Sequence, residues 1–371
     1  MHPAYDALDV QHALSLYSTH TARGCRCVMS PSITLAHTPP AAVASSSPDA
    51  ATLPPCFIPA LPSQLPMLRS WSEYLEQQSC FITVQQYFRM PDATRQVIMA
   101  QRVRSCMTPS RTGRGPQRAI FAIGDSHMGQ LSRALMTAFD GAASVVWAAA
   151  AFTCGYTSEW FMRNVMAHHL GDVRVEIALT VCKTFNEQID AALEAYLQPC
   201  DVVVLHQRSF SQGAEGDHDG KLVFDNDGGE SPHGGRATVY ARIRDLQRRV
   251  QLKGAKLVLL GDVAQLPTQP SICATSVGAL ARCELSRATV LVQTQVERTF
   301  YASLAEANNS TYHLPLDGYF CDEHRANREC GVVVPGTHTI AYLDNNHLGT
   351  AGTAYLWPFL CDFFTANGLV A

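Results

Sequence analysis

The stretch AIFAIGDSHMGQLSRAL, Ala119–Leu135, joins an apolar run to an amphipathic pattern through Gly-Asp-Ser-His. The apolar run has the length of a buried strand, and the pattern that follows has the spacing of a helix. Ser126 stands at the corner between the two. Such corners in α/β proteins lie at the carboxyl edge of the sheet, where ligands and reactive side chains gather. Ser126 is therefore either a nucleophile or a helix N-cap, a position that serine favours.

After Ala119 the chain alternates apolar runs of strand length with helical stretches. The runs at 201–206 (DVVVLH) and 255–262 (AKLVLLGD) are apolar on both faces, as in parallel strands that helices cover on each side. We therefore expect a three-layer α/β/α sandwich with a mainly parallel sheet. The expected strands are Ala119–Gly124, Ser144–Ala149, Val173–Ala178, Asp201–His206 and Ala255–Gly261, and the expected helices lie near His127–Phe139, Asn186–Tyr196 and Ala237–Leu252.

The composition limits the classes of function. With 371 residues, 47% of them hydrophobic, the chain can bury a sizeable core. Its net charge of -4 gives no electrostatic case for binding nucleic acid. The most apolar stretch falls short of the roughly 20 residues that a membrane-spanning helix needs.

The cysteine content and the N-terminus give opposite indications about the compartment. Thirteen cysteines favour an oxidising compartment, and the odd number leaves at least one thiol unpaired. The first thirty residues nevertheless carry no signal-peptide pattern, because Asp6, Asp9 and His12 interrupt any apolar core. Either the start is misassigned or the native chain continues upstream.

Composition also divides the chain into segments. Nine of the 20 prolines fall between Pro31 and Pro66, so we expect residues 1–66 to be disordered. Residues 67–118 form a helical and looped lead-in, and residues 119–371 form the α/β domain. The segment Ser209–Gly235 reads as a long polar loop, because its DHDG and DNDGG pieces lack the spacing of a twelve-residue calcium loop.

A second candidate group lies near the C-terminus, in AYLDNNHLGTAGTAYLWPFL (341–360). Asp344 and His347 are three residues apart at the entrance to the last expected helix, a spacing that puts two side chains on one face of a helical turn. The carboxylate can then hold one imidazole nitrogen while the other faces the hydroxyl of Ser126. A serine nucleophile needs such a base, and the base needs a group that fixes its tautomer. Taken separately, Asp344 can be a helix cap and His347 a surface histidine.

These motifs resemble the SGNH (GDSL-like) hydrolase superfamily, and most closely the SGNH domain that follows the membrane acyltransferase-3 domain in O-acyltransferases. GDSH (124–127) and DNNHL (344–348) carry the likeness. Three longer stretches between them are similar to the same subfamily and extend the resemblance over roughly residues 119–369. They are CDVVVLHQRSF (200–210), LQRRVQLKGAKLVLLGDVAQLPTQPSIC (246–273) and CDEHRANRECGVVVPGTHTIAYLDNNHL (321–348).

The resemblance assigns roles to individual residues. It implies that Ser126 is the nucleophile, His347 the general base and acid, and Asp344 the orienting carboxylate. Gly155 and Arg208 are implied as oxyanion or substrate contacts, although Gln207 and Arg208 stand where the superfamily supplies an asparagine. His127 is expected to be structural, and Gly349 departs from the usual serine. Disulfides are implied between Cys321 and Cys330 and between Cys154 and Cys182.

The function that the resemblance implies is transfer of an acyl group, most often acetyl, to a carbohydrate hydroxyl through an acyl-Ser126 intermediate. No cofactor is expected. The expected partners are an acylated small molecule, a glycan acceptor and either a membrane acyltransferase or an upstream membrane domain. The expected location is the secretory lumen or the cell exterior. The sequence leaves three alternatives open: an esterase with the same triad, a non-catalytic glycan-binding module, and a zinc site at Cys321, His324 and Cys330.

Overall fold

A computed structural model describes residues 80–82, 89–91, 94–111, 118–139, 143–150, 154, 172–208, 236–273, 281–321, 329–337 and 339–370. Four of the expectations fall outside these residues. They concern the N-terminal segment 1–66, the loop at 209–235, Gly155 and His324.

The centre of the fold is a six-stranded sheet in the order β1-β3-β2-β4-β5-β7, with every neighbouring pair parallel. The central strands are apolar on both faces, which matches their burial between two layers of helices. The strands are β1 (Phe81–Ile82), β2 (Ala119–Gly124), β3 (Ser144–Ala150), β4 (Val202–His206), β5 (Lys256–Leu260) and β7 (Thr311–Leu314).

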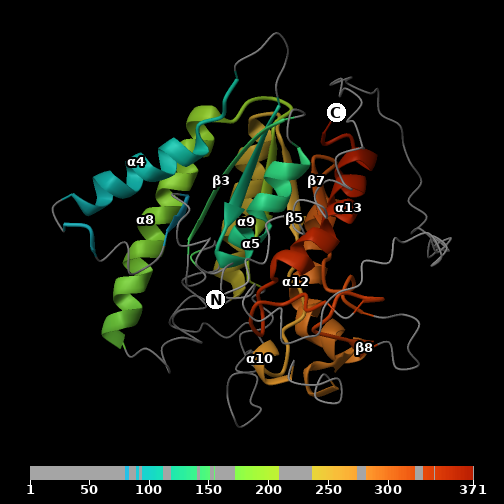
Figure 1. Ribbon diagram of the computed structural model, residues 1–371. Helices are drawn as coiled ribbons and strands as arrows, with labels where there is room; N and C mark the ends of the chain where they lie inside the picture. Colours follow the sequence, from blue (N-terminus) through green and yellow to red (C-terminus); the bar gives the residue numbers. More distant parts are fainter. Residues whose placement is uncertain are drawn as a thin grey trace, which may run out of the picture.

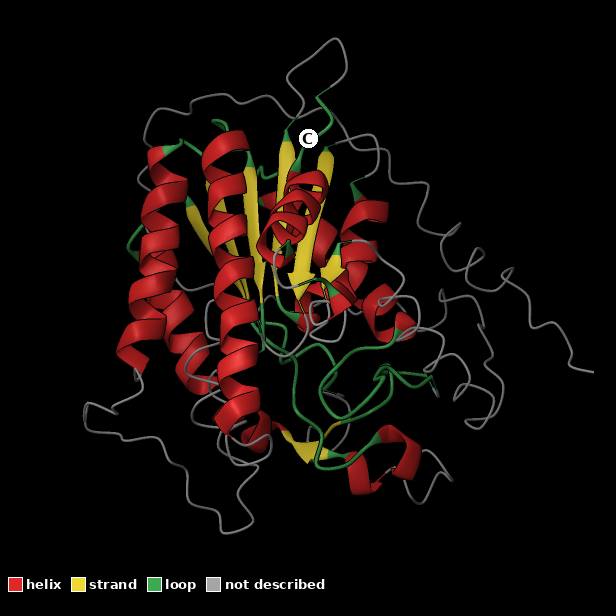
Figure 2. Ribbon diagram, turned by 90° about the vertical axis from the view of Figure 1, so that its left-hand side faces the viewer, coloured by secondary structure: helices red, strands yellow, loops and turns green. Residues whose placement is uncertain are grey.

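Helices cover both faces of the sheet, so the expected three-layer α/β/α architecture is confirmed (Figure 1). Alternate residues of β2 show the two cores. Phe121 and Ile123 pack with α4 (Arg95–Met107), α8 (Asp172–Tyr196), α9 (Arg236–Leu252) and α12 (Arg287–Glu306), the face that Figure 2 looks onto. Ile120 and Ala122 pack with α5 (Ser126–Ala138) and α13 (Thr350–Ala366).

A few short elements complete the described fold. Strands β6 (Leu285–Ser286) and β8 (Glu329–Cys330) form a separate antiparallel pair. Helix α10 (Pro270–Cys273) and the 3₁₀ turn η3 (Ala281–Cys283) precede them in the chain. Among the described residues, no helix combines the length and apolar character that crossing a membrane requires.

One of the five expected strands is wrong. Residues 173–178 belong to the 25-residue helix α8. Further along this helix, Val181, Phe185 and Ile189 are buried at intervals of four residues, as on one face of a helix. The helix that was expected to begin near Asn186 therefore starts much earlier, at Asp172. The other four expected strands agree with the structure to within a residue at each end.

Disulfides bind several of these elements, as is typical of proteins from an oxidising compartment. The structure joins Cys154 to Cys182 and Cys321 to Cys330, the two pairings that the resemblance implies. A further disulfide, Cys80–Cys106, ties the β1 segment to α4. Cys361 on α13 is a free cysteine.

Candidate active site

The corner between β2 and α5 places Ser126 at the carboxyl edge of the sheet. Asp125 caps the helix, since its Oδ1 accepts a hydrogen bond from the backbone N–H of His127 at 2.9 Å, and Ser126 is the first helical residue. Gly124 allows β2 to run close to β4 at this point. A Cβ on Gly124 would lie 1.8 Å from the carbonyl oxygen of His206, so the corner admits no side chain there.

The structure brings Ser126, His347 and Asp344 together in a continuous hydrogen-bonded chain. His347 Nε2 lies 2.8 Å from Ser126 Oγ, and His347 Nδ1 lies 2.8 Å from Asp344 Oδ2. When the Nδ1–H group donates a hydrogen bond to the carboxylate, Nε2 carries no proton and can accept a hydrogen bond from the serine hydroxyl. The three residues that the sequence singled out therefore lie in the order hydroxyl, imidazole and carboxylate, which is the geometry that a serine nucleophile requires.

Asp344 and His347 lie in a loop that precedes α13 rather than in its first turn, because the helix begins only at Thr350. The carboxylate itself shapes this loop. Asp344 Oδ1 accepts the backbone N–H groups of Asn346 at 2.9 Å and His347 at 2.8 Å. An aspartate that binds backbone N–H groups two and three residues ahead fixes a local turn without a helix.

The same hydrogen bonds set the charge of the carboxylate. Burial by itself would raise the pKa of Asp344, but the hydrogen bond and charge of His347, together with the two backbone N–H groups, lower it to about 2. Asp344 thus stays ionised across the physiological range. The side chains of His347 and Asp344 are 21% and 35% exposed, so solvent or a substrate can reach the site.

Comparison with known proteins places the chain in a family. The family model described as "SGNH domain (fused to AT3 domains)" matches residues 91–360, which is most of the chain. The chain belongs to this family. Membership supports acyl transfer or acyl hydrolysis as the general chemistry of this SGNH domain, and a membrane acyltransferase as its context.

Two solved structures are similar to this SGNH domain. One is the periplasmic domain of the lipopolysaccharide acetyltransferase of Salmonella ser. Paratyphi A, with 13% identity, a TM-score of 0.50, and coverage of 83% of this chain and 100% of that chain. The other is a Bacillus subtilis protein with 16% identity, a TM-score of 0.33, and coverage of 68% and 57%. At 13% identity the first likeness supports the fold alone. A search of curated proteins gives no match.

Behind the triad lies a buried polar layer that sequence reasoning largely missed. His127 Nδ1 lies 2.8 Å from Asp262 Oδ1, and the ring of His127 is 4.6 Å from the ring of His347. Burial lowers the pKa of His127, but the carboxylates of Asp262 and Asp125 outweigh it and leave that pKa raised. His127 is fully buried, in line with the structural role expected for it. In the sequence, the feature that could have indicated Asp262 is its position two residues after the apolar run of β5.

Of the two residues implied as oxyanion or substrate contacts, the structure describes Arg208 but not Gly155. Arg208 follows β4; its backbone N–H donates to Asp125 Oδ2 at 2.9 Å, and its Nη2 donates to Gln265 Oε1 at 3.2 Å. Burial lowers the pKa of Arg208, while three nearby carboxylates act in the opposite direction. These are Asp262, Asp125 and Asp344. Arg208 therefore lies within electrostatic reach of the triad.

The described residues hold one group that offers metal-ligand atoms in close proximity. His127, His206 and Asp262 are buried, with ligand atoms within 4.8 Å of one another. In the structure these atoms face protein partners, since His127 binds Asp262 and the two nitrogens of His206 face Leu260 O and Gln130 Nε2. The zinc alternative at Cys321 and Cys330 is wrong, because their sulfurs are bonded to each other.

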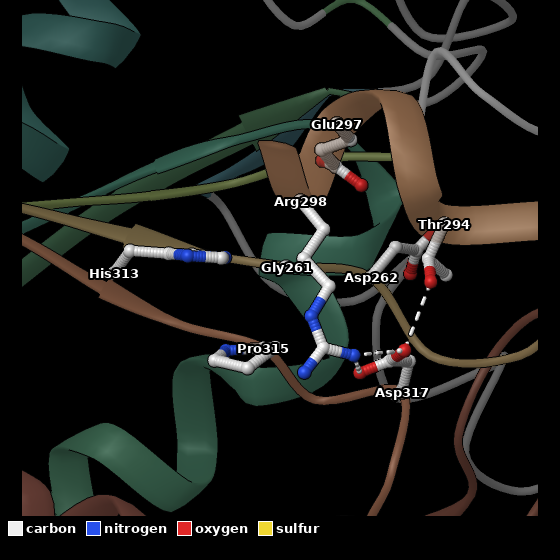
Figure 3. A pocket seen from close by; sticks show the side chains of 8 residues that line it. All are labelled: Gly261, Asp262, Thr294, Glu297, Arg298, His313, Pro315 and Asp317. Carbon is white, nitrogen blue, oxygen red and sulfur yellow. Dashed lines mark hydrogen bonds and ion pairs between the residues drawn. The ribbon is translucent and has the colours of Figure 1, made fainter. Parts of the chain in front are cut away.

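A small cavity adjoins Asp262, at the ends of β5 and β7 (Figure 3). Most of the residues that line it have polar side chains. Figure 3 shows Asp317 held by Arg298 and Thr294, through bonds of 3.1 Å and 2.8 Å to its Oδ2. The cavity does not contact Ser126 or His347, so it is separate from the place where an acyl group would react. Its remaining lining residues are Gly261, Glu297, His313 and Pro315.

Proposed function

We propose that this chain transfers an acyl group, acetyl in the first instance, to a carbohydrate hydroxyl through an acyl-Ser126 intermediate. The observation that carries the proposal is the 2.8 Å contact between Ser126 Oγ and His347 Nε2, backed by the 2.8 Å contact between His347 Nδ1 and Asp344. A base that is itself oriented by a carboxylate is what a serine hydroxyl needs in order to become a nucleophile.

The first half-reaction forms the acyl-enzyme. Ser126 Oγ attacks the carbonyl carbon of an ester or thioester while its proton passes to His347 Nε2. The tetrahedral intermediate then collapses, the bond from the carbonyl carbon to the leaving oxygen or sulfur breaks, and the imidazolium returns its proton to that atom. Asp344 remains ionised throughout and stabilises the imidazolium.

The negative charge of the tetrahedral intermediate needs donors near Ser126. The backbone N–H of Ser126 stands at the N-terminus of α5, where the helix dipole favours an anion. We assign Arg208 to the same task, because it lies among the carboxylates of the site and carries a positive charge. Gly155 completes the proposed set.

In the second half-reaction a hydroxyl group gives its proton to His347 Nε2 and attacks the acyl carbonyl carbon, and Ser126 Oγ regains the proton as it leaves. A sugar hydroxyl gives O-acyl transfer, and water gives ester hydrolysis. Transfer is the better proposal, because the family is described by its fusion to AT3 domains. Esterase activity is the second candidate, since both reactions use every group of the triad.

A non-catalytic glycan-binding module is less well supported by the site. Recognition of a glycan does not require an imidazole hydrogen-bonded to a serine hydroxyl. Nor does it require a buried network that holds the imidazole in one orientation. The 2.8 Å contact between Ser126 and His347 therefore favours catalysis over binding alone.

The test of this proposal is trapping of the acyl-enzyme. The purified chain is mixed with p-nitrophenyl acetate and quenched in acid within milliseconds, and its peptides are weighed by mass spectrometry. The peptide that contains Ser126 should gain one acetyl group, and Ser126→Ala should abolish both the adduct and the release of nitrophenol. Ser132→Ala is the matched control on the same helix, because the hydroxyl of Ser132 bonds only within the helix, to Gly129 O. An unmodified Ser126 peptide in an active protein would remove the covalent mechanism.

We also propose that a membrane acyltransferase supplies the acyl group to this domain outside the cytosol. The motivation is the family context and the disulfides, which fit an oxidising compartment. The purified chain should then hydrolyse small acetyl esters slowly and make little use of acetyl-coenzyme A, whether or not a sugar acceptor is added. Efficient transfer from acetyl-coenzyme A by the chain alone would show that no such partner is needed.

A further inference from the structure

The side chain of Gln130 links the helix of the nucleophile to the loop of the base. Gln130 follows Ser126 by four residues on α5, so it lies one turn further along the same face, and it is fully buried. Its Oε1 accepts the backbone N–H of Leu348 at 2.5 Å. Because Leu348 directly follows His347, this hydrogen bond holds the peptide group that joins the two residues.

The orientation of the Gln130 amide follows from its partners. Because Oε1 faces an N–H donor, Nε2 must face His206, whose Nε2 lies 3.5 Å away. His206 must then be neutral, with Nε2 as acceptor and with Nδ1–H directed to Leu260 O at 3.4 Å. Burial agrees with this, since it lowers the pKa of His206 to about 4.

We propose that Gln130 is a positioning residue that sets the distance between Ser126 and His347, and that neutral His206 holds the Gln130 amide in the required orientation. The proposal rests on the proposed function. It adds a buried series of contacts from His206 at the end of β4, through Gln130 on α5, to the backbone next to His347.

Other backbone hydrogen bonds of this loop run within it or to the segment after β5, where Leu266 N–H donates to Asn345 O at 2.7 Å. Leu343 N–H donates to His347 O, and Gly349 N–H donates to Ala341 O, both at 2.7 Å. None of these backbone bonds joins the loop to α5, whereas the bond from Leu348 N–H to Gln130 does. A displacement of about 1 Å at a reacting group can cost on the order of 100-fold in rate.

The test compares Gln130→Met with Gln130→Glu. Methionine has nearly the same size but accepts no strong hydrogen bond, so kcat for ester hydrolysis should fall about 10- to 100-fold while KM changes less than about twofold. Glutamate keeps an acceptor for Leu348 N–H and should recover most of kcat. That recovery should be larger at pH 6 than at pH 8, because the new carboxylate raises the pKa of His206 above its value in the wild-type chain, and the protonated Nε2 then donates to the carboxylate.

Gln247→Met is the matched control. Gln247 lies on α9, and its Nε2 makes two hydrogen bonds of 2.9 Å, to Leu304 O and Thr311 Oγ1, at the end of the sheet opposite the triad. Its loss should lower the unfolding temperature and leave kcat unchanged. Circular dichroism first shows that each variant is folded. Each kcat is then measured at a temperature well below the unfolding transition of that variant. If Gln130→Met does not fold, Gln130→Asn serves instead, because the shorter amide cannot reach Leu348.

The outcomes separate the two proposals. A wild-type chain that is no more active than Ser126→Ala would contradict the proposed function. An active wild-type chain with an unchanged kcat in folded Gln130→Met would contradict the positioning role alone. So would a Gln130→Glu variant that is no better than Gln130→Met at either pH.

Discussion

At the scale of single residues, the site depends on which nitrogen of His347 carries the proton. Asp344 decides this, because its carboxylate accepts from Nδ1 and leaves Nε2 free to take the proton of Ser126. Asp344→Asn keeps the shape but presents an amide that can donate to Nδ1 and so favour the wrong tautomer. We expect kcat to fall roughly 10³- to 10⁴-fold, as removal of such a carboxylate does in a serine triad. Stopped-flow hydrolysis of p-nitrophenyl acetate would measure this, and a loss of less than tenfold would contradict the role of Asp344.

A second residue-scale prediction concerns the pH dependence of stability. The pKa of His206 is about 4 in the folded state against 6.5 in the absence of its surroundings, because burial disfavours the cation. Between these values the unfolded chain binds more protons, so stability is fully present above pH 6.5 and is lost as the pH falls toward 4. The loss should be about 2 kcal/mol between pH 7.5 and pH 5 for His206.

Urea unfolding at the two pH values would measure this effect, and His206→Gln should reduce it. The reduction should be partial, because burial lowers the pKa of His313 to about 4 as well, and that histidine contributes in the same pH window. An equal loss of stability in His206→Gln and the wild-type chain would indicate that His206 is not held neutral.

At the scale of elements, the corner between β2 and α5 carries Ser126, the proposed nucleophile, and Gly124 makes that corner possible. Its φ is +158°, and a Cβ added at this position would lie 1.8 Å from His206 O, so alanine does not fit. Gly124→Ala should lower the free energy of unfolding by more than about 3 kcal/mol, beyond the range of most single substitutions. Gly336→Ala is the control, because Gly336 has a φ of +74° but nothing within 4 Å of its Cβ. It should cost only about 1–2 kcal/mol. Equal effects in urea unfolding would contradict the steric argument.

The elements also show where sequence reasoning succeeds and fails. The runs VVVLH and KLVLL read correctly as strands, because they are apolar throughout and short. The residues VRVEIA (173–178) alternate as a strand does, but the packing of the helix that continues beyond them decides their structure. Strand β7 was not predicted, because its four residues, TYHL, are too few to show the hydrophobic pattern of a strand.

The same limit applies to the candidate site. The sequence predicts Ser126, Asp344 and His347, because the motifs GDSH and DNNHL contain the hydroxyl, carboxylate and imidazole that the chemistry needs. It does not predict the contacts of Gln130, His206 and Asp262, because these form only when α5, β4 and β5 meet at one edge of the sheet.

At the scale of the whole molecule, the question is where the folded unit begins. The sequence places the start of the α/β domain at residue 119, yet β1 pairs with β3, and α4 lies against α8 and β3 on one face of the sheet (Figure 1). Met99, Val103 and Met107 of α4 are at most 1% exposed and belong to the core on that face. We therefore expect the cooperative unit to begin near Cys80, whose disulfide to Cys106 fastens the two ends of this segment.

This expectation is tested by comparing the chains 80–371 and 119–371. Burying an apolar side chain of this size contributes about 1.5–3 kcal/mol, so the three α4 residues alone contribute roughly 5–9 kcal/mol. Domains are stable by only about 5–15 kcal/mol in total, and removing α4 also exposes the apolar surfaces of α8 and β3 that it covers. The shorter chain should consequently show no cooperative thermal transition by circular dichroism and no esterase activity. The longer chain should unfold cooperatively and retain the Ser126-dependent activity. A chain of residues 119–371 that melts at the same temperature as 80–371 would show that α4 is an accessory to this SGNH domain rather than part of its core.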